Sequence, residues 1–432
     1  MIENSYPYRL TIPVSAAEKA IFKQQALQWA QQFEQCLYLE NNGLEYPQQP
    51  FRNLLGVRQD AHNLVQLEQA FNSLQEALQE KKWLLGFLCY DLKNQVEELE
   101  SQHPNHLNFP LMHFFEPEIL LLFEKNEIII QSKKDNCAEI IYEIKKQQIS
   151  DKQLKNDIKL KQRVSREQYL HDVEAVRQHI VEGDVYELNY CMEFFVENAV
   201  VEPLQLFRQL SKMSPTPFAG FLKLQNKYLL CASPERFLKK EQQKLVSQPI
   251  KGTIRRGSTP AEDAQLRHQL RHDEKEQAEN LMIVDLVRND LARVSEIGSV
   301  KVDELFGIYP FQHVFQMIST ISSQKRPEVT VAEILKATFP MGSMTGAPKI
   351  RAMQLIEQYE HSRRGLYSGS IGFISPEQDF DFNVVIRSIQ YNAGTGYLSF
   401  TVGSAITYDS VPEQEYEECL LKAKAMFGVL GC

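Results

Sequence analysis

Pro249-Ile250-Lys251-Gly252-Thr253 is the most informative stretch of the chain for fold and function. It ends a predicted strand and places a lysine amine between an apolar pair and a glycine. A lysine that its neighbours desolvate can lose its proton near neutral pH and act as a nucleophile, whereas a lysine on an open surface stays an ammonium. Solvated lysines at strand ends are far commoner. Lys251 is therefore a candidate nucleophile that needs support from other residues.

The segments around this stretch predict runs of strands with few helices between them. Strands are expected at 185–195, 218–224, 228–232, 245–253, 366–375, 380–391 and 396–407, and the segments 83–92 and 118–130 are expected to be strands or buried segments. Helices are expected at 166–182, 203–213, 274–294, from Pro348 onward and at 413–427. Because regular helical crossovers do not separate the strands, the pattern favours an α+β fold with antiparallel sheets over a doubly wound fold.

Composition indicates a large globular chain with one internal boundary. The 432 residues are 43% hydrophobic, enough for one large or two ordinary domains. The polar, lysine-rich segment from Lys145 to Arg163 is either a linker or a charged helix. Ser165-x-x-Gln168 then reads as a capping box that opens a helix ending at Gly183. We divide the chain into an N-terminal region, 1–145, a linker, 146–164, and a catalytic region, 165–432.

Charge and apolar runs exclude two classes of partner. A formal charge of −9 disfavours nucleic acid, which selects a basic face. No apolar run reaches the ~20 residues that span a bilayer, and no basic segment followed by an apolar one opens the chain. We therefore expect a cytoplasmic protein with no membrane partner. The seven scattered cysteines, without a C-x-x-C pair, are expected to be reduced packing residues.

Two pairs of glutamates are candidate metal ligands. Glu276 and Glu279 share one face of a predicted helix, and Glu415 and Glu418 share one face of another. If the two helices face each other, four carboxylates converge, an arrangement suited to Mg²⁺. With 56 acidic residues in the chain, solvated helix faces are the alternative explanation for each pair.

Two further segments could carry acid chemistry or hold an anion. Glu235, in Ser233-Pro-Glu-Arg-Phe237, follows a predicted buried strand, where a carboxyl with a raised pKa could serve as a general acid. A pair with Arg236 is the alternative. Ser343 lies in Gly342-Ser-Met-Thr-Gly-Ala-Pro-Lys349, which lacks the spacing of a nucleotide-binding loop. This segment could hold an anion at a helix N-terminus or could simply cap the helix.

A carboxylate site is predicted from Arg387 and Tyr367, both expected on strands. An arginine fork beside a phenol binds a carboxylate through two hydrogen bonds, although a structural ion pair explains Arg387 equally well. Gly403, Ser404 and Ala405 end another predicted strand, where small residues allow a ligand to approach the backbone.

Six motifs, in this order, resemble the chorismate-utilising enzymes, the family of anthranilate, aminodeoxychorismate, isochorismate and salicylate synthases. They are S-P-E-R-F from Ser233, P-I-K-G-T-x-R-R-G from Pro249, A-E-N-L-M-I-V-D-L-x-R-N-D-L from Ala278, G-S-M-T-G-A-P-K from Gly342, I-R-S from Ile386 and D-S-V-P-E-x-E-Y-x-E from Asp409. The resemblance covers 165 to the C-terminus. It implies a large α+β fold with two packed antiparallel β-sheets flanked by helices.

The resemblance also implies roles for the candidate residues. Lysine at position 251 is typical of the members that form aminodeoxychorismate, whereas anthranilate synthases carry alanine there. Lys251 would attack C2 of chorismate while Glu235 protonates the departing C4 hydroxyl, and ammonia would then add at C4 and expel the lysine. The remaining matches are substrate contacts and Mg²⁺ ligands: Gly252, Thr253, Ser343, Tyr367, Arg387, Gly403, Ser404, Ala405 and Lys422 for chorismate, and Glu276, Glu279, Glu415 and Glu418 for the metal.

Departures from the family pattern narrow the expected reaction. Glu187 stands where water-using members carry a lysine base, which favours ammonia as the incoming nucleophile. Gln316 replaces a histidine of many relatives that could help pyruvate elimination, which fits a product that keeps its enolpyruvyl group. Leu39-Glu40-Asn41 poorly matches the segment that recognises tryptophan in related enzymes, so we do not expect tryptophan regulation. No cysteine has a glutaminase context, so ammonia is expected from solution or from a separate glutamine amidotransferase subunit. Anthranilate synthase component I and a catalytically silent glutaminase-binding partner remain the alternatives.

Overall fold

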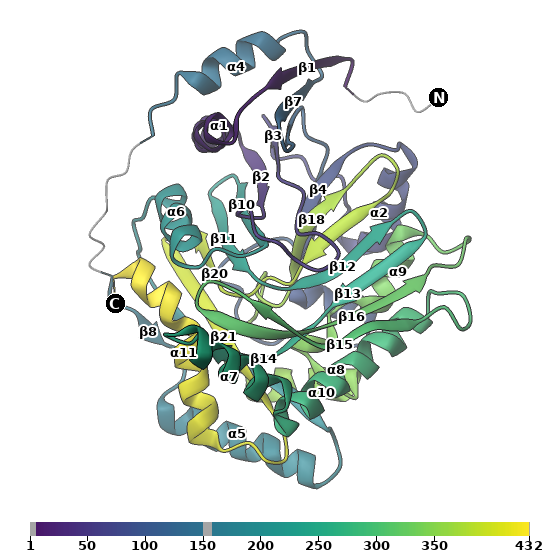
Figure 1. Cartoon of the computed structure of the whole chain (residues 1–432), viewed down its shortest axis with the longest axis vertical. Coiled ribbons are helices and arrows are strands. Elements are labelled where there is room, and N and C mark those ends of the chain that lie inside the picture. Colours follow the sequence, from purple (N-terminus) through teal and green to yellow (C-terminus); the bar gives the residue numbers. More distant parts are fainter. Residues whose placement is uncertain (1–5, 150–157, 432) are drawn as a thin grey trace.

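Two large antiparallel sheets form the centre of the molecule (Figure 1). The computed structural model describes residues 6–149 and 158–431.

The first sheet contains, in spatial order, β1 (Tyr8–Pro13), β7 (Glu127–Ser132), β6 (Ile119–Phe123), β3 (Leu54–Arg58), β2 (Gln35–Glu40), β10 (Phe218–Leu224), β11 (Lys227–Ser233), β20 (Ser388–Asn392), β21 (Tyr397–Ile406), β9 (Glu187–Val196) and β17 (Gly346–Ala347). A short strand, β8 (Lys161–Gln162), also pairs with β9. The second contains β14 (Ile250–Arg255), β16 (Val314–Gln324), β13 (Lys244–Gln248), β12 (Arg236–Glu241), β19 (Phe380–Asn383), β18 (Ser370–Ile374), β4 (Leu84–Leu88) and β5 (Met112–Phe115), and β15 (Lys301–Pro310) also pairs with β16.

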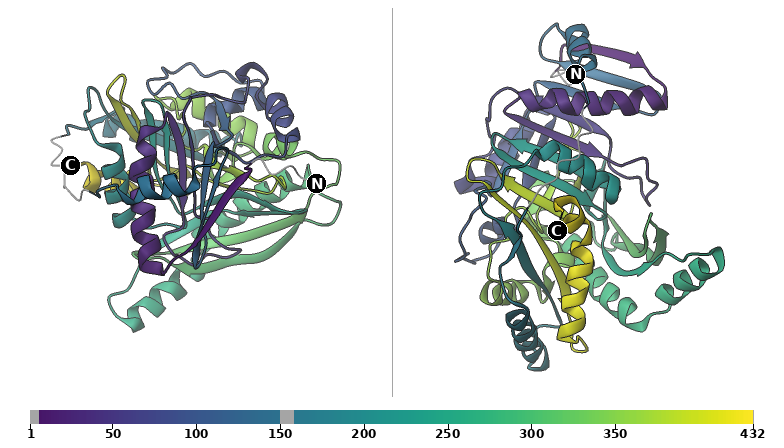
Figure 2. Two further views of the ribbon diagram at one scale, coloured as in Figure 1. Left: turned by 90° about the horizontal axis from the view of Figure 1, so that it is seen from above. Right: turned by 90° about the vertical axis from the view of Figure 1, so that its left-hand side faces the viewer.

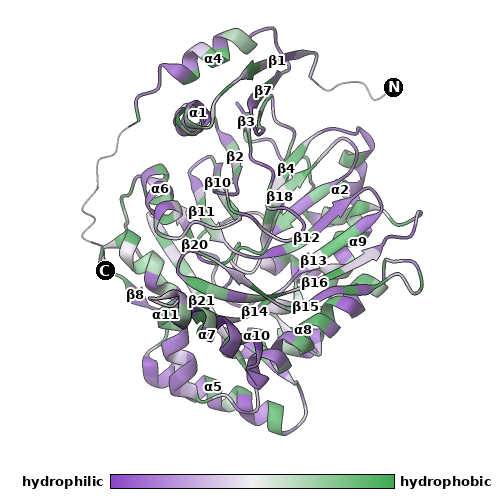
Figure 3. Cartoon of the chain, viewed as in Figure 1, coloured by the Kyte–Doolittle hydropathy of each residue, from purple (hydrophilic) through white to green (hydrophobic). Residues whose placement is uncertain are grey.

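Apolar side chains hold the two sheets face to face. One buried cluster joins strands of both sheets, with Leu37 and Leu222 from the first and Phe87 and Ile371 from the second. Gly220 faces Ile371 so closely that a Cβ would lie 2.4 Å from its Cδ1. The inner face is therefore a packed core, and Figure 3 shows hydrophobic colour along the strands.

Helices cover the outer faces of both sheets. A second buried cluster joins the first sheet to α1 (Ala16–Trp29), α4 (Cys137–Lys145), α5 (Arg166–Val181), α6 (Pro203–Met213), α10 (Lys349–Tyr359) and α11 (Pro412–Leu430). A third joins the second sheet to α2 (Ala70–Gln79), α8 (Glu274–Ala292) and α9 (Val331–Thr338). The short α3 (Lys93–Val96) follows β4, and α7 (Pro260–Arg271) follows β14. The α+β class with two packed antiparallel sheets is thus confirmed.

The N-terminal region supplies strands to both sheets. β2 pairs with β10, and β4 pairs with β18. Figures 1 and 2 show β1, α1 and α4 at one end of the molecule, away from α5 and α7. Residues 150–157 of the expected linker lie outside the described residues, and the division into 1–145 and 165–432 stays a prediction.

Several element boundaries differ from the sequence prediction. Pro249 separates β13 from β14, because it cannot donate a ladder hydrogen bond. The expected strand at 380–391 is two strands, β19 and β20. Pro348 is the residue before α10, which begins at Lys349. Half of the expected capping box is wrong, since Ser165 caps α5 but Gln168 donates to Asp172 instead.

The cysteine prediction is confirmed for six residues. Cys36, Cys89, Cys137, Cys191, Cys231 and Cys419 are buried free thiols. The seventh, Cys432, lies outside the described residues. Within residues 6–149 and 158–431, no helix has the length and apolar character needed to cross a bilayer.

Candidate functional site

Lys251 lies in an irregular part of β14. The pairing of β14 with β16 shifts register between Ile250 and Thr253. Gly252 within this bulge has a φ of +94°, which favours glycine, and a Cβ there would lie 3.1 Å from Oε2 of Glu276. The Asn280 side chain of α8 donates to the Lys251 carbonyl at 3.4 Å. The bulge therefore brings Lys251 close to the face of α8 that carries the acids.

The Lys251 amine is buried and forms an ion pair across the two sheets. Its Nζ donates to Oε1 of Glu187, the first residue of β9, at 2.5 Å. The side chains are 9% and 1% exposed. The solvated-surface interpretation of Lys251 is therefore wrong.

The electrostatic setting of Lys251 differs from the sequence expectation. Burial alone lowers the pKa of a lysine, but the Glu187 carboxylate, with Glu279 and Glu235 nearby, outweighs burial and raises the pKa of Lys251 above its usual range. The resting residue is an ammonium. An ammonium has no lone pair, so Lys251 could act as a nucleophile only after losing this proton.

Glu235 has the properties of a general acid. It lies in the turn between β11 and β12 and is 3% exposed. Burial raises the pKa of its carboxyl to about 7, although a hydrogen bond from Ser343 and the Lys251 ammonium oppose the rise. Arg236 pairs with Asp381 at 2.8 Å rather than with Glu235. The alternative of a Glu235–Arg236 ion pair is therefore wrong.

The two predicted acid pairs lie on helices that face each other. Lys275 of α8 lies 3.8 Å from Glu279 of its own helix and 3.7 Å from Glu415 of α11. Burial lowers the pKa of Lys275, but the four carboxylates together raise it above its usual value. Glu279 and Glu415 are buried, Glu276 is half-buried and Glu418 is 45% exposed. The acids are thus not two separate solvated helix faces.

The donor set fits a hard divalent cation. All four groups are carboxylates, and Mg²⁺ prefers oxygen ligands. The Lys275 ammonium already stands between the two helices as a cation. Burial disfavours the charged form of the Glu279 carboxyl and raises its pKa to about 7. A bound cation would stabilise that charged form. No three of the four acids have oxygens within 4.8 Å of one another, as expected for like charges held apart.

Arg387 and Tyr367 lie near each other, but neither is on a strand. Arg387 lies between β19 and β20 with a φ of +50°, and Tyr367 precedes β18. The backbone of Ser368 donates to Val385 at 2.9 Å, so the two segments run side by side. The strand assignments of Arg387 and Tyr367 are wrong because the backbone turns at both residues. Among the described residues none forms an ion pair with the half-buried Arg387 guanidinium, which leaves it available for a carboxylate.

The small residues of β21 pair with β9, the strand that begins at Glu187. Gly403 aligns with Cys191 and Ala405 with Asn189, and a Cβ at Gly403 would lie 2.4 Å from the Cys191 sulfur. Lys422 of α11 donates to the Gly403 carbonyl at 2.9 Å and pairs with Glu418 at 2.7 Å.

Two predicted substrate contacts, Ser404 and Thr253, have side chains that lie away from Gly403 and Lys422. The Ser404 hydroxyl contacts the Tyr169 hydroxyl at 3.2 Å, in the core under α5, so only its backbone is on the Gly403 side. Thr253 is exposed.

The glycine-rich segment from 342 to 349 holds β9 in place. Gly346 and Ala347 form β17, which pairs with Leu188 and Glu187. Gly346 has a φ of +146°, and a Cβ there would lie 2.1 Å from the Glu187 carbonyl oxygen. The backbone amides of Met344 and Thr345 donate to Met341 and Gly342. These contacts favour the structural interpretation of this segment over an anion site, while Ser343 contacts Glu235 as described above.

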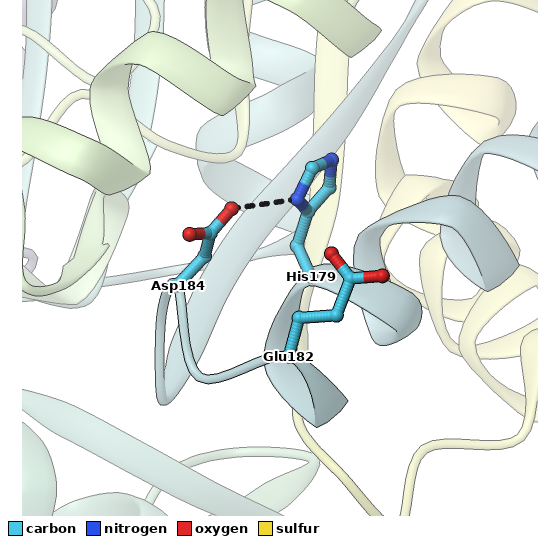
Figure 4. A group of neighbouring side chains, drawn as sticks. All are labelled: His179, Glu182 and Asp184. Atoms are coloured by element: carbon cyan, nitrogen blue, oxygen red, sulfur yellow. Dashed lines mark hydrogen bonds and ion pairs between the residues drawn. The ribbon is translucent and has the colours of Figure 1, made fainter.

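A second cluster of metal-ligating side chains lies at the end of α5 (Figure 4). His179 bonds Asp184 through Nδ1 at 2.8 Å and the Tyr359 hydroxyl through Nε2 at 2.9 Å. Asp184 also pairs with Arg351 at 2.6 Å. Because both imidazole nitrogens are engaged, the cluster serves to fasten the turn before β9 to α10.

Sequence reasoning missed Glu187 and Lys275 as members of the site. Glu187 entered only as the replacement of a lysine, and nothing in the sequence shows that β9 faces β14. Lys275 lies in the helical spacing i, i+4 with Glu279, which is a signal for a local ion pair.

Three buried side-chain oxygens in and near the site have no hydrogen-bond partner among the described residues: Oε2 of Glu187, Oδ1 of Asn189 and Oε1 of Gln316.

Comparison with known proteins identifies the family of this chain. The family described as chorismate binding enzyme matches residues 21–428. An aminodeoxychorismate synthase component 1 from Bacillus subtilis is 32% identical over 79% of this chain and 75% of the relative. An anthranilate synthase component 1 from Thermus thermophilus is 33% identical over 79% of this chain and 76% of the relative. Overall identity therefore does not separate these two activities.

Longer and solved relatives add two observations. A probable chloroplastic aminodeoxychorismate synthase from rice, Oryza sativa subsp. japonica, is 45% identical over 60% of this chain, which spans only 29% of that protein. The crystal structure of anthranilate synthase component I from Streptococcus pneumoniae aligns with 99% of this chain and 94% of its own, at 25% identity and a TM-score of 0.75. The two-sheet fold is therefore shared with that enzyme.

Proposed function

Because this chain belongs to the chorismate binding enzyme family, we propose that it aminates chorismate at C4 with ammonia to give 4-amino-4-deoxychorismate, a precursor of para-aminobenzoate and folate. One observation carries the proposal: Lys251 is a buried lysine, and among the charges that act on it is Glu235, a buried carboxyl with a pKa of about 7. A relative named aminodeoxychorismate synthase component 1 supports it. An alanine at position 251 could not form a covalent bond to the substrate.

The reaction divides one difficult displacement into two allylic ones. In the first, the free amine of Lys251 attacks C2 of chorismate, the ring double bonds shift, and the C4 hydroxyl leaves as water with the proton of Glu235. In the second, ammonia attacks C4, the double bonds shift back, and the C2–N bond to Lys251 breaks. The new C4 ammonium then returns a proton to Glu235. Atoms and protons balance as chorismate plus ammonia giving aminodeoxychorismate plus water.

The remaining residues of the site hold the substrate. Glu276, Glu279, Glu415 and Glu418 would hold Mg²⁺, whose chemistry is to bind and neutralise the ring carboxylate. Lys422 orders the Gly403 carbonyl beside that position. The Arg387 guanidinium, which has no ion-pair partner among the described residues, would bind the enolpyruvyl carboxylate through two parallel hydrogen bonds, with the Tyr367 phenol beside it.

Ammonia has two proposed sources. It would come from solution or from a separate glutamine amidotransferase subunit, since the name component 1 of the bacterial relatives implies a second component. The activity with free ammonium tests the first source without any partner.

Anthranilate synthase component I is the second candidate, favoured by the 33% identity to the Thermus protein. One incubation of the purified chain with chorismate, Mg²⁺ and ammonium separates the two. We expect the aminated product by mass spectrometry and no anthranilate fluorescence. Fluorescence would overturn the proposal, and turnover without a partner eliminates a silent glutaminase-binding role.

A Lys251→Ala variant tests the nucleophile, with Lys240→Ala as its matched control. Lys240 is another buried lysine in an ion pair, 2.9 Å from Asp379, outside the site. We expect Lys251→Ala to abolish aminodeoxychorismate formation and Lys240→Ala to keep it in the folded fraction. Full activity of Lys251→Ala would exclude covalent catalysis by this residue.

A further inference from the structure

Glu187 has one carboxylate oxygen on the amine of Lys251 and one oxygen with no partner. Oε1 accepts from Nζ of Lys251 at 2.5 Å. Oε2 is buried without a hydrogen-bond partner among the described residues. The Glu187 side chain is 1% exposed. A buried carboxylate with an open acceptor position next to a reacting nitrogen is placed to take a proton.

Lys251 needs such an acceptor before it can react. An ammonium has no lone pair, and the pKa of Lys251 lies above its usual range because the carboxylates around it outweigh burial. Water is a poor acceptor here, since the Lys251 side chain is 9% exposed. The proton must therefore pass to a group that already touches Nζ.

Other charged groups face Lys251, but each has another role. Glu235 of the β11–β12 turn must start protonated to act as the acid. Glu276 and Glu279 of α8 and Glu418 of α11 belong to the proposed metal ligands, and Lys422 of α11 is itself a cation. Among the described residues, Glu187 is the carboxylate within hydrogen-bond distance of Nζ.

We propose that Glu187 is a catalytic residue of this site, the base that takes the proton from Lys251 before attack and returns it when the lysine leaves. This inference rests on the proposed amination through a Lys251 adduct. It gives a role to the residue that stands where water-using relatives carry a lysine.

The proton exchange is complete within one turnover. The proton moves from Nζ to Glu187, which leaves a neutral amine beside a neutral acid. The amine then forms the C2–N bond, and Glu235 protonates the leaving hydroxyl. When ammonia has added at C4 and the C2–N bond breaks, Lys251 leaves as a neutral amine. Glu187 returns its proton to it, and the resting ion pair is restored.

Formation of the Lys251 adduct in chorismate without ammonia tests this role. The protein is mixed with chorismate and Mg²⁺, quenched at intervals and weighed by mass spectrometry. We expect Glu187→Gln to form the adduct about 100-fold more slowly than the wild type near neutral pH, the scale of general base catalysis. Glu187→Asp, which keeps a carboxylate, should recover a large part of the rate.

The pH dependence separates a base from a merely structural partner. In Glu187→Gln the proton must go to solvent, so the ratio of wild-type to variant rates should shrink by about tenfold per pH unit until Lys251 titrates. The effect of Glu235 cancels in this ratio, because both proteins carry it. If Glu187 only positions Lys251, both proteins lose the lysine proton to solvent, and the ratio of their rates should not change with pH.

Each outcome decides the question. A Glu187→Gln rate within about threefold of wild type, or a pH-independent ratio, overturns the role of Glu187. If Glu187→Gln does not fold by circular dichroism, the pH profile of the wild type decides: a rate of adduct formation that does not rise between about pH 5 and pH 7 supports an internal base, and a rise of about tenfold per pH unit, as for loss of the proton to solvent, overturns it. If the wild type itself forms no adduct, the proposed function fails rather than this inference.

Discussion

The Nζ of Lys251 lies 2.5 Å from Oε1 of Glu187, and this contact joins the second sheet to the first. Both partners are buried, and the Lys251 ammonium is held by one carboxylate oxygen, so the amine has no free lone pair in this arrangement. Removing either partner leaves a buried charge uncompensated, which is costly. In the proposed mechanism the resting and the reactive state of the site differ by the position of one proton.

Loss of the C4 hydroxyl should follow the titration of Glu235. Its carboxyl acts in the protonated form and has a pKa of about 7, so adduct formation should fall as pH rises through that value. Glu235→Gln should lower the rate of adduct formation by about 100-fold or more. The fall in rate near pH 7 should then be absent from the pH profile of the variant. Rapid-quench mass spectrometry over a pH series measures both. An unchanged profile in the variant would assign the acid elsewhere.

The same carboxyl predicts how stability depends on pH. The folded pKa of Glu235, about 7, lies above the ordinary value of 4.5, so its contribution to stability is lost as pH rises through about 7. Glu235→Gln should therefore raise the free energy of unfolding at about pH 8 by roughly 3 kcal/mol, and by much less at about pH 5. Urea unfolding at the two pH values measures this. Equal effects at both would contradict the buried, protonated carboxyl.

Lys275 should compete with Mg²⁺ for the four acids. Its ammonium lies within 4.0 Å of Glu279 and Glu415 and is 48% exposed, so it can move aside at modest cost. Lys275→Met should bind Mg²⁺ about two- to fivefold more tightly, the scale of an exposed ion pair. Calorimetric titration with Mg²⁺ alone measures this without any turnover.

Lys301→Met is the matched control for Lys275→Met. Lys301 is an exposed lysine at the start of β15, so its removal changes the net charge equally. It should leave Mg²⁺ affinity unchanged. Equal tightening in both variants would show a general charge effect rather than displacement of Lys275.

Arg387 should contribute to substrate affinity rather than to stability. No described residue pairs with its guanidinium, so Arg387→Lys should leave the thermal midpoint unchanged or raise it. The same variant should raise KM for chorismate by about tenfold or more, since an ammonium cannot make two parallel hydrogen bonds to a carboxylate. A lowered midpoint with unchanged KM would indicate a structural arginine.

Gly346 should matter through the strand that carries Glu187. A Cβ there would lie 2.1 Å from the Glu187 carbonyl oxygen, so Gly346→Ala should displace β9 and slow adduct formation. Gly183→Ala is the control, because Gly183 also has a positive φ, +85°, but no atom within 4 Å of a Cβ. It should cost about 1 kcal/mol of stability and keep the rate. Equal slowing in both variants would contradict the steric argument.

The sequence predicted the elements that have strong local signals. α6 begins and ends where expected, because Pro203 opens it and apolar residues recur at helical spacing. Strands β10 and β11 also match closely. Predicted strand boundaries were wrong where a proline or a turn interrupts a strand, as at Pro249 and around Arg387.

The site could be predicted only as separate motifs. The spacing of Glu276 with Glu279 fixes one helix face, and that prediction needs no tertiary information. The contact of Lys251 with Glu187 depends on how two sheets pack, over 64 residues of separation. Its consequence, a raised rather than lowered pKa for Lys251, follows from neighbours that the local sequence does not contain.

The mass of the protein after incubation with chorismate and Mg²⁺, without ammonia, tests the central claim most directly. Peptide mapping then locates any modification. The account predicts a gain of one chorismate less one water, located on Lys251 and reversed when ammonium is added with release of aminodeoxychorismate. An unmodified protein that still aminates chorismate would contradict it.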